Sequence, residues 1–266
     1  MGVTKKLCRR LLVRLQGRVL RVRLNRPEVH NALDGELIED LAACCSAVEA
    51  GGEVRAVLLS GEGPSFCAGA DLNWMREAAG WSAEENRRDA QRLAAMLAAL
   101  NDLPVPSVAR IHGGALGGGA GLLACCDVVV AADTTRFSFA EVKLGLLPAV
   151  ISPFVVAKIG ESHARALFAT GERFDAQRAL RIGLVHHVIP EATLDAAVER
   201  VLAELLTSAP AAAAEARRLI REVQGRSPAD VRDYTAETIA RLRASDEGRE
   251  GIAAFLEKRK PRWVNT

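Results

Sequence analysis

Long apolar runs and an excess of one charge are both missing from this sequence. The chain of 266 residues has a formal net charge of +2, so its composition gives no electrostatic case for a nucleic-acid partner. The stretch from Leu122 to Ala132 is among the longest apolar ones, but Asp127 interrupts it, and a membrane-spanning helix needs roughly 20 apolar residues. With 49% hydrophobic and 26% charged residues, we expect a globular protein without a membrane partner.

The spacings of metal sites are missing too. The six cysteines include no C-x-x-C pair, and the five histidines lack the spacings that place two imidazoles on one metal. Four cysteines lie in apolar or glycine-rich settings, where a thiol packs as a small apolar group: Cys45, Cys67, Cys125 and Cys126. We expect no metal and a reducing, cytoplasmic environment.

Strand and helix patterns begin near the N-terminus. Leu20, Val22 and Leu24 alternate with polar residues, which predicts a half-buried strand of a hairpin rather than a transit peptide. Asp34 is placed to cap a helix that ends at Gly51-Gly52, because apolar residues follow it at helical spacing.

A strand, a glycine-containing loop and a helix then occur twice in the same order, which predicts a layered α/β sheet with both loops opening on one side. The segments are a strand over 54–60, a loop over 61–71, a helical region through Met75 and, after Gly80, a long helix to Leu100, then a strand over 106–111, a glycine-rich turn over 112–121 entering a helix, and a strand over 127–131. From residue 191 onward, helical periodicity without strand signals predicts a helical tail.

The glycine-rich segment 116–121 is suited to holding an anion at a helix start. Unhindered backbone lets a ligand approach closely, and unpaired N–H groups at the positive end of the helix dipole favour an oxyanion. A tight turn packed against the helix explains these glycines equally well. Gly119-x-Gly121-x-x-Ala124 formally matches the dinucleotide fingerprint, but its glycines fall inside the helix and Asp133 follows too soon to bind a ribose.

Three segments stand out by their order and spacing. They are Phe66-Cys-Ala-Gly-Ala-Asp-Leu72, His112-Gly-Gly-Ala-Leu-Gly-Gly-Gly119 and Phe137-Ser-Phe-Ala-Glu-Val-Lys-Leu-Gly-Leu-Leu-Pro148. Together they closely resemble the enoyl-CoA hydratase/isomerase, or crotonase, superfamily. Similar motifs at 24–32, 170–176, 183–185 and 254–261 extend the resemblance over nearly the whole chain.

The resemblance implies an α/β fold of the crotonase type. Residues 1–190 would form a spiral of repeated ββα units, and residues 191–266 a C-terminal helical trimerisation region. The protein would be a homotrimer or a dimer of trimers, that is, a hexamer. Its substrate would be an acyl-CoA thioester, and it would need no cofactor because CoA enters as part of the substrate.

The resemblance also implies the site. The backbone N–H groups of Ala68 and Gly118 would form an oxyanion hole, and Glu141 would give or take a proton on the acyl chain. The alternative interpretation of Glu141 is a surface carboxylate in a loop. The residues expected to bind CoA are Ala68, Gly69, Ala70, Asp71, Gly118, Phe255 and Lys258.

Phe255 and Lys258 match family positions that contact the adenosine part of CoA, often from a neighbouring subunit. Arg259 and Lys260 add charge suited to a 3′-phosphate. A basic, solvated helix end is the alternative interpretation of this segment.

Gly121 departs from the family pattern, because many enoyl-CoA hydratases carry a second glutamate there. A lone carboxylate fits an enoyl-CoA isomerase, which moves a proton between carbons. The segments 69–76 and 143–153, however, resemble bacterial methylglutaconyl-CoA hydratase-like members, which act in branched-chain catabolism. We therefore predict an enoyl-CoA hydratase, a lyase, for a branched, carboxylated substrate such as 3-methylglutaconyl-CoA, with the isomerase as the alternative.

A second carboxylate on the substrate needs a cationic or amide partner, and Arg76, Asn73 and Lys143 are the nearest candidates in the sequence. Each could also be an ordinary solvated side chain. A non-catalytic, RNA-binding relative is a third alternative. It is weakly supported, because the helix Glu36 to Glu49 contains no lysine or arginine.

Overall fold

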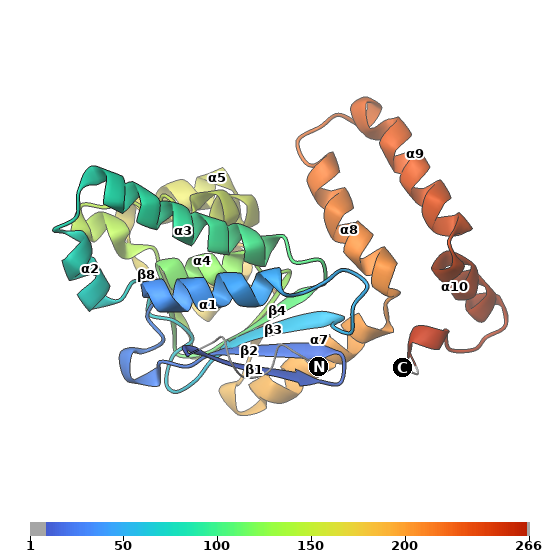
Figure 1. Ribbon diagram of the computed structural model, residues 1–266, viewed down its shortest axis with the longest axis horizontal. Helices are drawn as coiled ribbons and strands as arrows, with labels where there is room; N and C mark the ends of the chain where they lie inside the picture. Colours follow the sequence, from blue (N-terminus) through green and yellow to red (C-terminus); the bar gives the residue numbers. More distant parts are fainter. Residues whose placement is uncertain (1–8, 265–266) are drawn as a thin grey trace.

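The computed structural model describes residues 9–264, and a six-stranded sheet lies at the centre of its main body (Figure 1). Its first two strands form an antiparallel hairpin, as the alternating pattern predicts, and all other neighbouring pairs are parallel. The order across the sheet is β1-β2-β3-β4-β6-β9. The strands are β1 (Leu11–Gln16), β2 (Val19–Leu24), β3 (Ala56–Gly61), β4 (Ser107–Ile111), β6 (Val128–Ala132) and β9 (His187–Ile189).

A second sheet of three short strands joins β5, β7 and β8. Because β5 follows β4 and precedes helix α4, these three elements form one strand–strand–helix unit. The sequence predicted only a glycine-rich turn before α4, since three residues that begin with glycine show no alternation to detect. The bounds are β5 (Gly114–Leu116), β7 (Arg136–Ser138), β8 (Arg173–Asp175) and α4 (Gly118–Ala124).

Helices cover both faces of the large sheet (Figure 1). Helix α1 starts after the predicted cap, where the Asp34 carboxylate accepts the Leu37 N–H at 2.8 Å, but it ends at Ser46, before the expected glycine pair. Within residues 9–264, no helix is long and apolar enough to cross a membrane. The helices of the main body are α1 (Gly35–Ser46), α2 (Leu72–Ala78), α3 (Ala83–Asn101), α5 (Ser152–Thr170), α6 (Ala176–Arg181) and α7 (Leu194–Thr207), with the 3-10 helices η1 (Pro27–Val29), η2 (Ala140–Leu144) and η3 (Glu191–Thr193).

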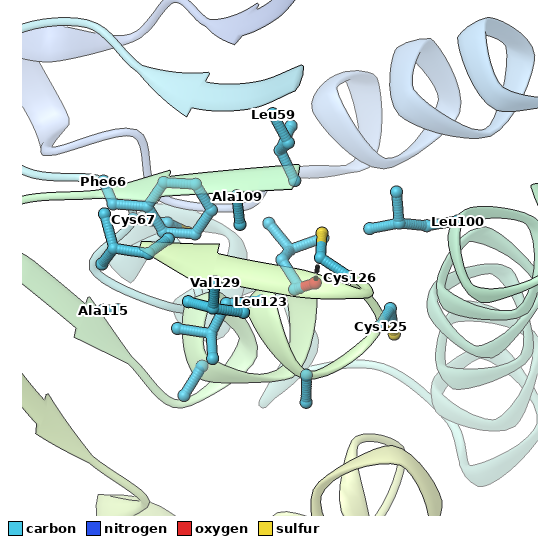
Figure 2. Packing of buried hydrophobic residues seen from close by; sticks show 14 of the residues in the cluster. Leu59, Phe66, Cys67, Leu100, Ala109, Ala115, Leu123, Cys125, Cys126 and Val129 are labelled. Carbon is cyan, nitrogen blue, oxygen red and sulfur yellow. Dashed lines mark hydrogen bonds between the residues drawn. The ribbon is translucent and has the colours of Figure 1, made fainter. Parts of the chain in front are cut away.

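The larger core lies between the sheet and helices α1, α3, α4 and α5, and it also takes in side chains from the loop after β3. Figure 2 shows Phe66 and Cys67 from this loop near Ala109 of β4 and Ala115 of β5. Burial raises the pKa of the Cys67 thiol to about 12, so the thiol stays neutral and packs as an apolar group. A buried phenylalanine contributes about 1.5–3 kcal/mol. The loop after β3 is therefore anchored by its own side chains.

The helices after α7 extend away from the sheet (Figure 1). Helix α7 itself packs on the second face of the sheet through Leu194, Val198 and Leu202, so by packing it belongs with the main body, beyond the expected boundary at residue 190. The outer elements are α8 (Pro210–Val223), α9 (Pro228–Ala244), α10 (Asp246–Leu256) and the 3-10 helix η4 (Arg262–Val264). Large apolar side chains exposed on the three outer helices include Ile220, Ile239, Ile252, Phe255 and Leu256. A trimerisation role for this tail stays a prediction.

One arginine of α8 fastens the tail to the main body. The Nε of Arg217 donates to Asp127 at 2.8 Å, and its two terminal nitrogens donate to the carbonyls of Leu103 and Asn101. A guanidinium carries donors on three nitrogens and so reaches three separated acceptors, whereas the three donors of a lysine ammonium all lie on one nitrogen. Arg217 therefore holds the start of the tail against the ends of α3 and α4.

Replacing Arg217 with lysine is expected to lower the free energy of unfolding by about 1–3 kcal/mol, because partly buried oxygens lose their donors. Urea unfolding followed by circular dichroism measures the change. Arg218→Lys, at an exposed position of the same helix, is the control, with an expected change below about 0.5 kcal/mol. Equal losses in the two variants would contradict the anchoring role.

Candidate active site

The loops that follow β3 and β4 lie side by side, as the sequence predicted, because parallel neighbours end at the same edge of the sheet. Their backbones pair directly. Phe66 N–H donates to the His112 carbonyl at 2.9 Å, and Cys67 N–H donates to the Gly114 carbonyl at 3.0 Å. Leu116 N–H donates back to the Cys67 carbonyl at 3.0 Å. This ladder brings Ala68 next to the start of α4.

Two glycines permit this close approach. A Cβ on Gly119 would lie 2.4 Å from the Cys67 carbonyl oxygen, and a Cβ on Gly117 would lie 2.9 Å from Oε1 of Glu141. Gly117 also has φ +46°, a conformation that side chains disfavour. The second contact shows that the Glu141 carboxyl group lies over the backbone that leads into Gly118. The structure thus brings together Ala68, Gly118 and Glu141, the three predicted catalytic residues.

The two expected N–H donors differ in whether a group of the protein already accepts their hydrogen. Gly118 is the first residue of α4, and among residues 9–264 no acceptor takes its N–H group. The Ala68 N–H instead donates to the His30 carbonyl at 2.9 Å. A substrate oxygen can therefore bind the Gly118 N–H directly, whereas at Ala68 it must share or displace an existing hydrogen bond.

Glu141 has the environment of a group that exchanges protons. Burial raises the pKa of its carboxyl group, and a hydrogen bond from its own backbone N–H opposes this only in part. Its Oε2 is buried and has no hydrogen-bond partner among the described residues. A buried acceptor without a partner costs stability, and such groups concentrate at functional sites. Glu141 therefore keeps its proton to a higher pH than an ordinary glutamate does, and it offers one free oxygen to a ligand.

Asp71, four residues beyond Cys67, is a second buried carboxylate with the opposite environment. It accepts from Arg26 Nη2 at 2.8 Å and caps α2 by accepting the N–H groups of Asn73 and Trp74. Burial alone would raise its pKa, but these hydrogen bonds outweigh burial and hold the pKa below its usual range. The Asp71 side chain therefore serves the fold, and its expected contact with CoA falls to its backbone.

The position expected to matter most for the reaction type, Gly121, is filled from the neighbouring helix. A Cβ on Gly121 would lie 2.2 Å from Cγ2 of Ile151, which precedes α5 and is buried. Neither an open cavity nor a polar group stands there. The position where many family members carry a second glutamate is therefore next to an apolar side chain, and a carboxylate there would have to move Ile151.

An apolar rim next to Glu141 was not singled out from the sequence. Leu144, Leu146 and Leu147 are 63%, 54% and 71% exposed, and Leu146 N–H donates to the Glu141 carbonyl at 3.0 Å. Exposed leucines gathered at a site commonly bind an apolar ligand or another chain. The run Leu144-Gly-Leu-Leu-Pro148 was a usable signal, because three leucines beside a candidate catalytic residue are costly to expose.

The residues expected to contact the adenosine part of CoA lie apart from Glu141 in the single chain. Phe255 and Lys258 belong to α10 and its end, in the outer tail of Figure 1, and Phe255 is 82% exposed. Arg259 is not a free charge, because it pairs with Glu250 and Glu257. Their contact with CoA stays a prediction.

The three candidates for a substrate carboxylate are all exposed. Arg76 of α2 donates to the Asn73 side chain at 2.8 Å, so these two act as one group. Lys143 lies two residues after Glu141 in η2. Among the residues that the structure describes, His, Cys, Asp and Glu side chains form no group that could hold a metal ion.

Glu141→Gln is expected to stabilise the fold near pH 7. Since the folded-state pKa lies above that of the unfolded chain, the stability linked to this group is present at low pH and is lost as pH rises through the folded pKa. A neutral glutamine avoids that loss. Thermal unfolding should show the gain at pH 7 and its disappearance below the ordinary glutamate pKa of about 4.3. The control Glu204→Gln, at an exposed position of α7, should show no such pH dependence.

Gly121→Ala is expected to cost about 1–3 kcal/mol of unfolding free energy, because its methyl group overlaps Ile151. In an Ile151→Ala background the same change should cost at least about 1 kcal/mol less, since contacting residues couple. A double-mutant cycle by urea unfolding measures this. Additive losses would show that Ile151 does not fill the position.

Comparison with known proteins shows the family of the chain. The enoyl-CoA hydratase/isomerase family model matches residues 14–266. An enoyl-CoA hydratase from Shewanella pealeana has a crystal structure with a TM-score of 0.92 and 39% identity, covering 96% of each chain. The 2,3-dehydroadipyl-CoA hydratase of Escherichia coli is 34% identical over 94% of this chain and 97% of its own. An enoyl-CoA isomerase/hydratase of Mycosarcoma maydis is 34% identical over 90% of this chain and 89% of its own. The chain is thus an enzyme with the crotonase fold and belongs to the enoyl-CoA hydratase/isomerase family.

Proposed function

We propose that this enzyme adds water across the 2,3 double bond of an enoyl-CoA thioester, with Glu141 as its single acid and base. The observation that carries the proposal is the buried, unpartnered Oε2 of Glu141, whose carboxyl group lies over the Gly117 backbone. A carboxyl group with a raised pKa and a free oxygen can bind water and exchange protons.

In this mechanism the thioester oxygen binds the N–H groups of Gly118 and Ala68. Glu141 takes a proton from water as the water oxygen bonds to C3, and the double-bond electrons shift through C2 onto the thioester oxygen. The protonated Glu141 then delivers the same proton to C2. Each N–H donor would stabilise the enolate by about 3–4 kcal/mol. Because one carboxyl group serves both steps, water and proton add to the same face of the substrate.

A carboxylated acyl chain is the substrate class that we favour, and 3-methylglutaconyl-CoA is the example. The Escherichia coli relative is named for a substrate of the dehydroadipyl type, a dicarboxylic acyl group. Arg76, held by Asn73, and Lys143 supply cations on the two elements that flank the site. The CoA part would lie along Ala68–Asp71 and meet Phe255 and Lys258 from the tail of another copy in a homotrimer or a dimer of trimers.

Double-bond isomerisation is the second candidate, and the apolar wall at Ile151 favours it. A lone carboxyl group can move a proton between C2 and C4 without binding water. The Mycosarcoma maydis relative carries both activities in its name. The two reactions share the oxyanion hole and differ in whether solvent oxygen enters the product.

The test incubates the purified protein with crotonyl-CoA and with 3-methylglutaconyl-CoA in oxygen-18 water and follows the product mass. We expect label in the product, faster with the carboxylated substrate. Glu141→Gln should lower kcat by about 10²- to 10⁴-fold, the usual contribution of a general acid–base group. Glu204→Gln should leave kcat unchanged.

The possible outcomes separate the candidates. Equal rates for the two substrates would remove the carboxylated class while keeping hydration. No label, together with conversion of a 3-enoyl-CoA to its 2-enoyl isomer, would establish the isomerase. Near-normal hydration by Glu141→Gln would overturn the role of this residue.

A further inference from the structure

His112 is a buried polar residue that the proposed mechanism does not use. It follows β4 and is 8% exposed. Its Nε2 lies 2.8 Å from the Gly63 carbonyl oxygen, and its Nδ1 lies 2.9 Å from Nη1 of Arg110. Since a guanidinium nitrogen can only donate, Nδ1 must accept, and the ring proton is on Nε2. The imidazole is therefore held as one neutral tautomer that donates to Gly63.

This hydrogen bond joins the two loops of the oxyanion hole. Gly63 belongs to the loop that leads to Ala68, and His112 begins the loop that leads to Gly118. The backbone ladder between these loops starts at Phe66, so the bond to Gly63 extends their contact beyond the end of the ladder. At Gly113 the loops meet so closely that a Cβ would lie 2.0 Å from the Pro64 carbonyl oxygen.

The same loop is held from its other side by Asn31. This side chain is fully buried and donates to the carbonyls of Glu62 and Ser65, both at 2.8 Å. Residues 62–65 are thus fixed between Asn31 and His112. Residues 62–65 lead directly into Phe66 and Cys67 of the backbone ladder, and so to Ala68.

Hydrogen bonds orient the His112 ring. A cavity of about 400 Å³ borders His112, Arg110 and Gly63, so the site has one open side although His112 itself is buried. Arg110 is itself fixed from the opposite side by Asp195 of α7. The ion pair between Asp195 and Arg110 and the hydrogen bond from Arg110 to His112 together orient the ring.

We infer that His112 is a positioning residue that sets the distance between the Ala68 and Gly118 N–H groups by fastening the loop 61–65 to the loop 112–118. The inference rests on the proposed oxyanion hole. A displacement of about 1 Å in such a site can cost about 10²-fold in rate. The substrate contacts themselves would remain, so the loss should fall on kcat and not on KM.

Two amide variants separate the two hydrogen bonds. Glutamine places its NH₂ group as far from Cα as Nε2 and can still reach Gly63, whereas asparagine reaches only as far as Nδ1 and can serve Arg110 alone. His112→Asn is expected to lower kcat about 10-fold or more with KM changed less than about twofold. His112→Gln is expected to restore most of kcat. His163→Asn, at an exposed position of α5, is the control.

A second readout does not need turnover. Acetoacetyl-CoA can bind as its enolate, which has its own ultraviolet absorbance and mimics the charge that the oxyanion hole stabilises. The wild type and His112→Gln should raise the enolate fraction of the bound ligand, and His112→Asn should not. Urea unfolding midpoints show whether a variant has simply lost stability.

The inference is overturned if His112→Asn matches the wild type in kcat and in enolate signal, or if His112→Gln and His112→Asn lose both equally. If the wild type neither hydrates the substrates nor stabilises the enolate, the proposed function fails and this inference fails with it. An active wild type with an unaffected His112→Asn variant would remove only the role of His112.

Discussion

The site depends on the close approach of two backbone segments, one after β3 and one after β4. At Gly113 and Gly119 the opposite carbonyl oxygens lie where a side chain would begin, at 2.0 and 2.4 Å from an added Cβ. Any larger residue would push the segments apart and separate Ala68 from Gly118. The parallel pairing of β3 with β4 brings the segments together, and the buried Phe66 and Cys67 keep them there. The fold and the proposed oxyanion hole therefore depend on the same contact.

Two buried carboxyl groups near this contact show how surroundings decide a role. Asp71 receives hydrogen bonds from Arg26 and from the start of α2, so its charge is stabilised and its proton is lost early. Glu141 has no partner for Oε2, so its charge is poorly stabilised and its proton is held to higher pH. The first group strengthens the fold and cannot exchange protons usefully. The second weakens the fold, and that same deficit makes it available to a substrate.

Patterns that repeat along the chain were predictable, and contacts that depend on side-chain packing were not. The hairpin, the Asp34 cap, the paired loops and the helical tail follow from alternation, capping chemistry and helical spacing. The short strand β5 was missed because it has only three residues. Helix α7 packs against the sheet because its apolar face buries strand side chains, a contact that helical spacing alone does not reveal. For the proposed site, the family resemblance pointed to Glu141, Ala68 and Gly118, which the fold brings together. It could not identify Ile151 or His112, whose importance comes only from where the fold places their atoms.

Ile151 has consequences for the chemistry that the missing glutamate alone does not have. A merely absent carboxylate would leave a space in which an ordered water could take over part of its role. A buried isoleucine side chain fills that space with methyl groups that neither donate nor accept hydrogen bonds. In the hydration that we propose, water would then have only Glu141 to hold it, and the proton that leaves the water would return through the same carboxyl group. That mechanism would confine attack and protonation to one face of the acyl chain.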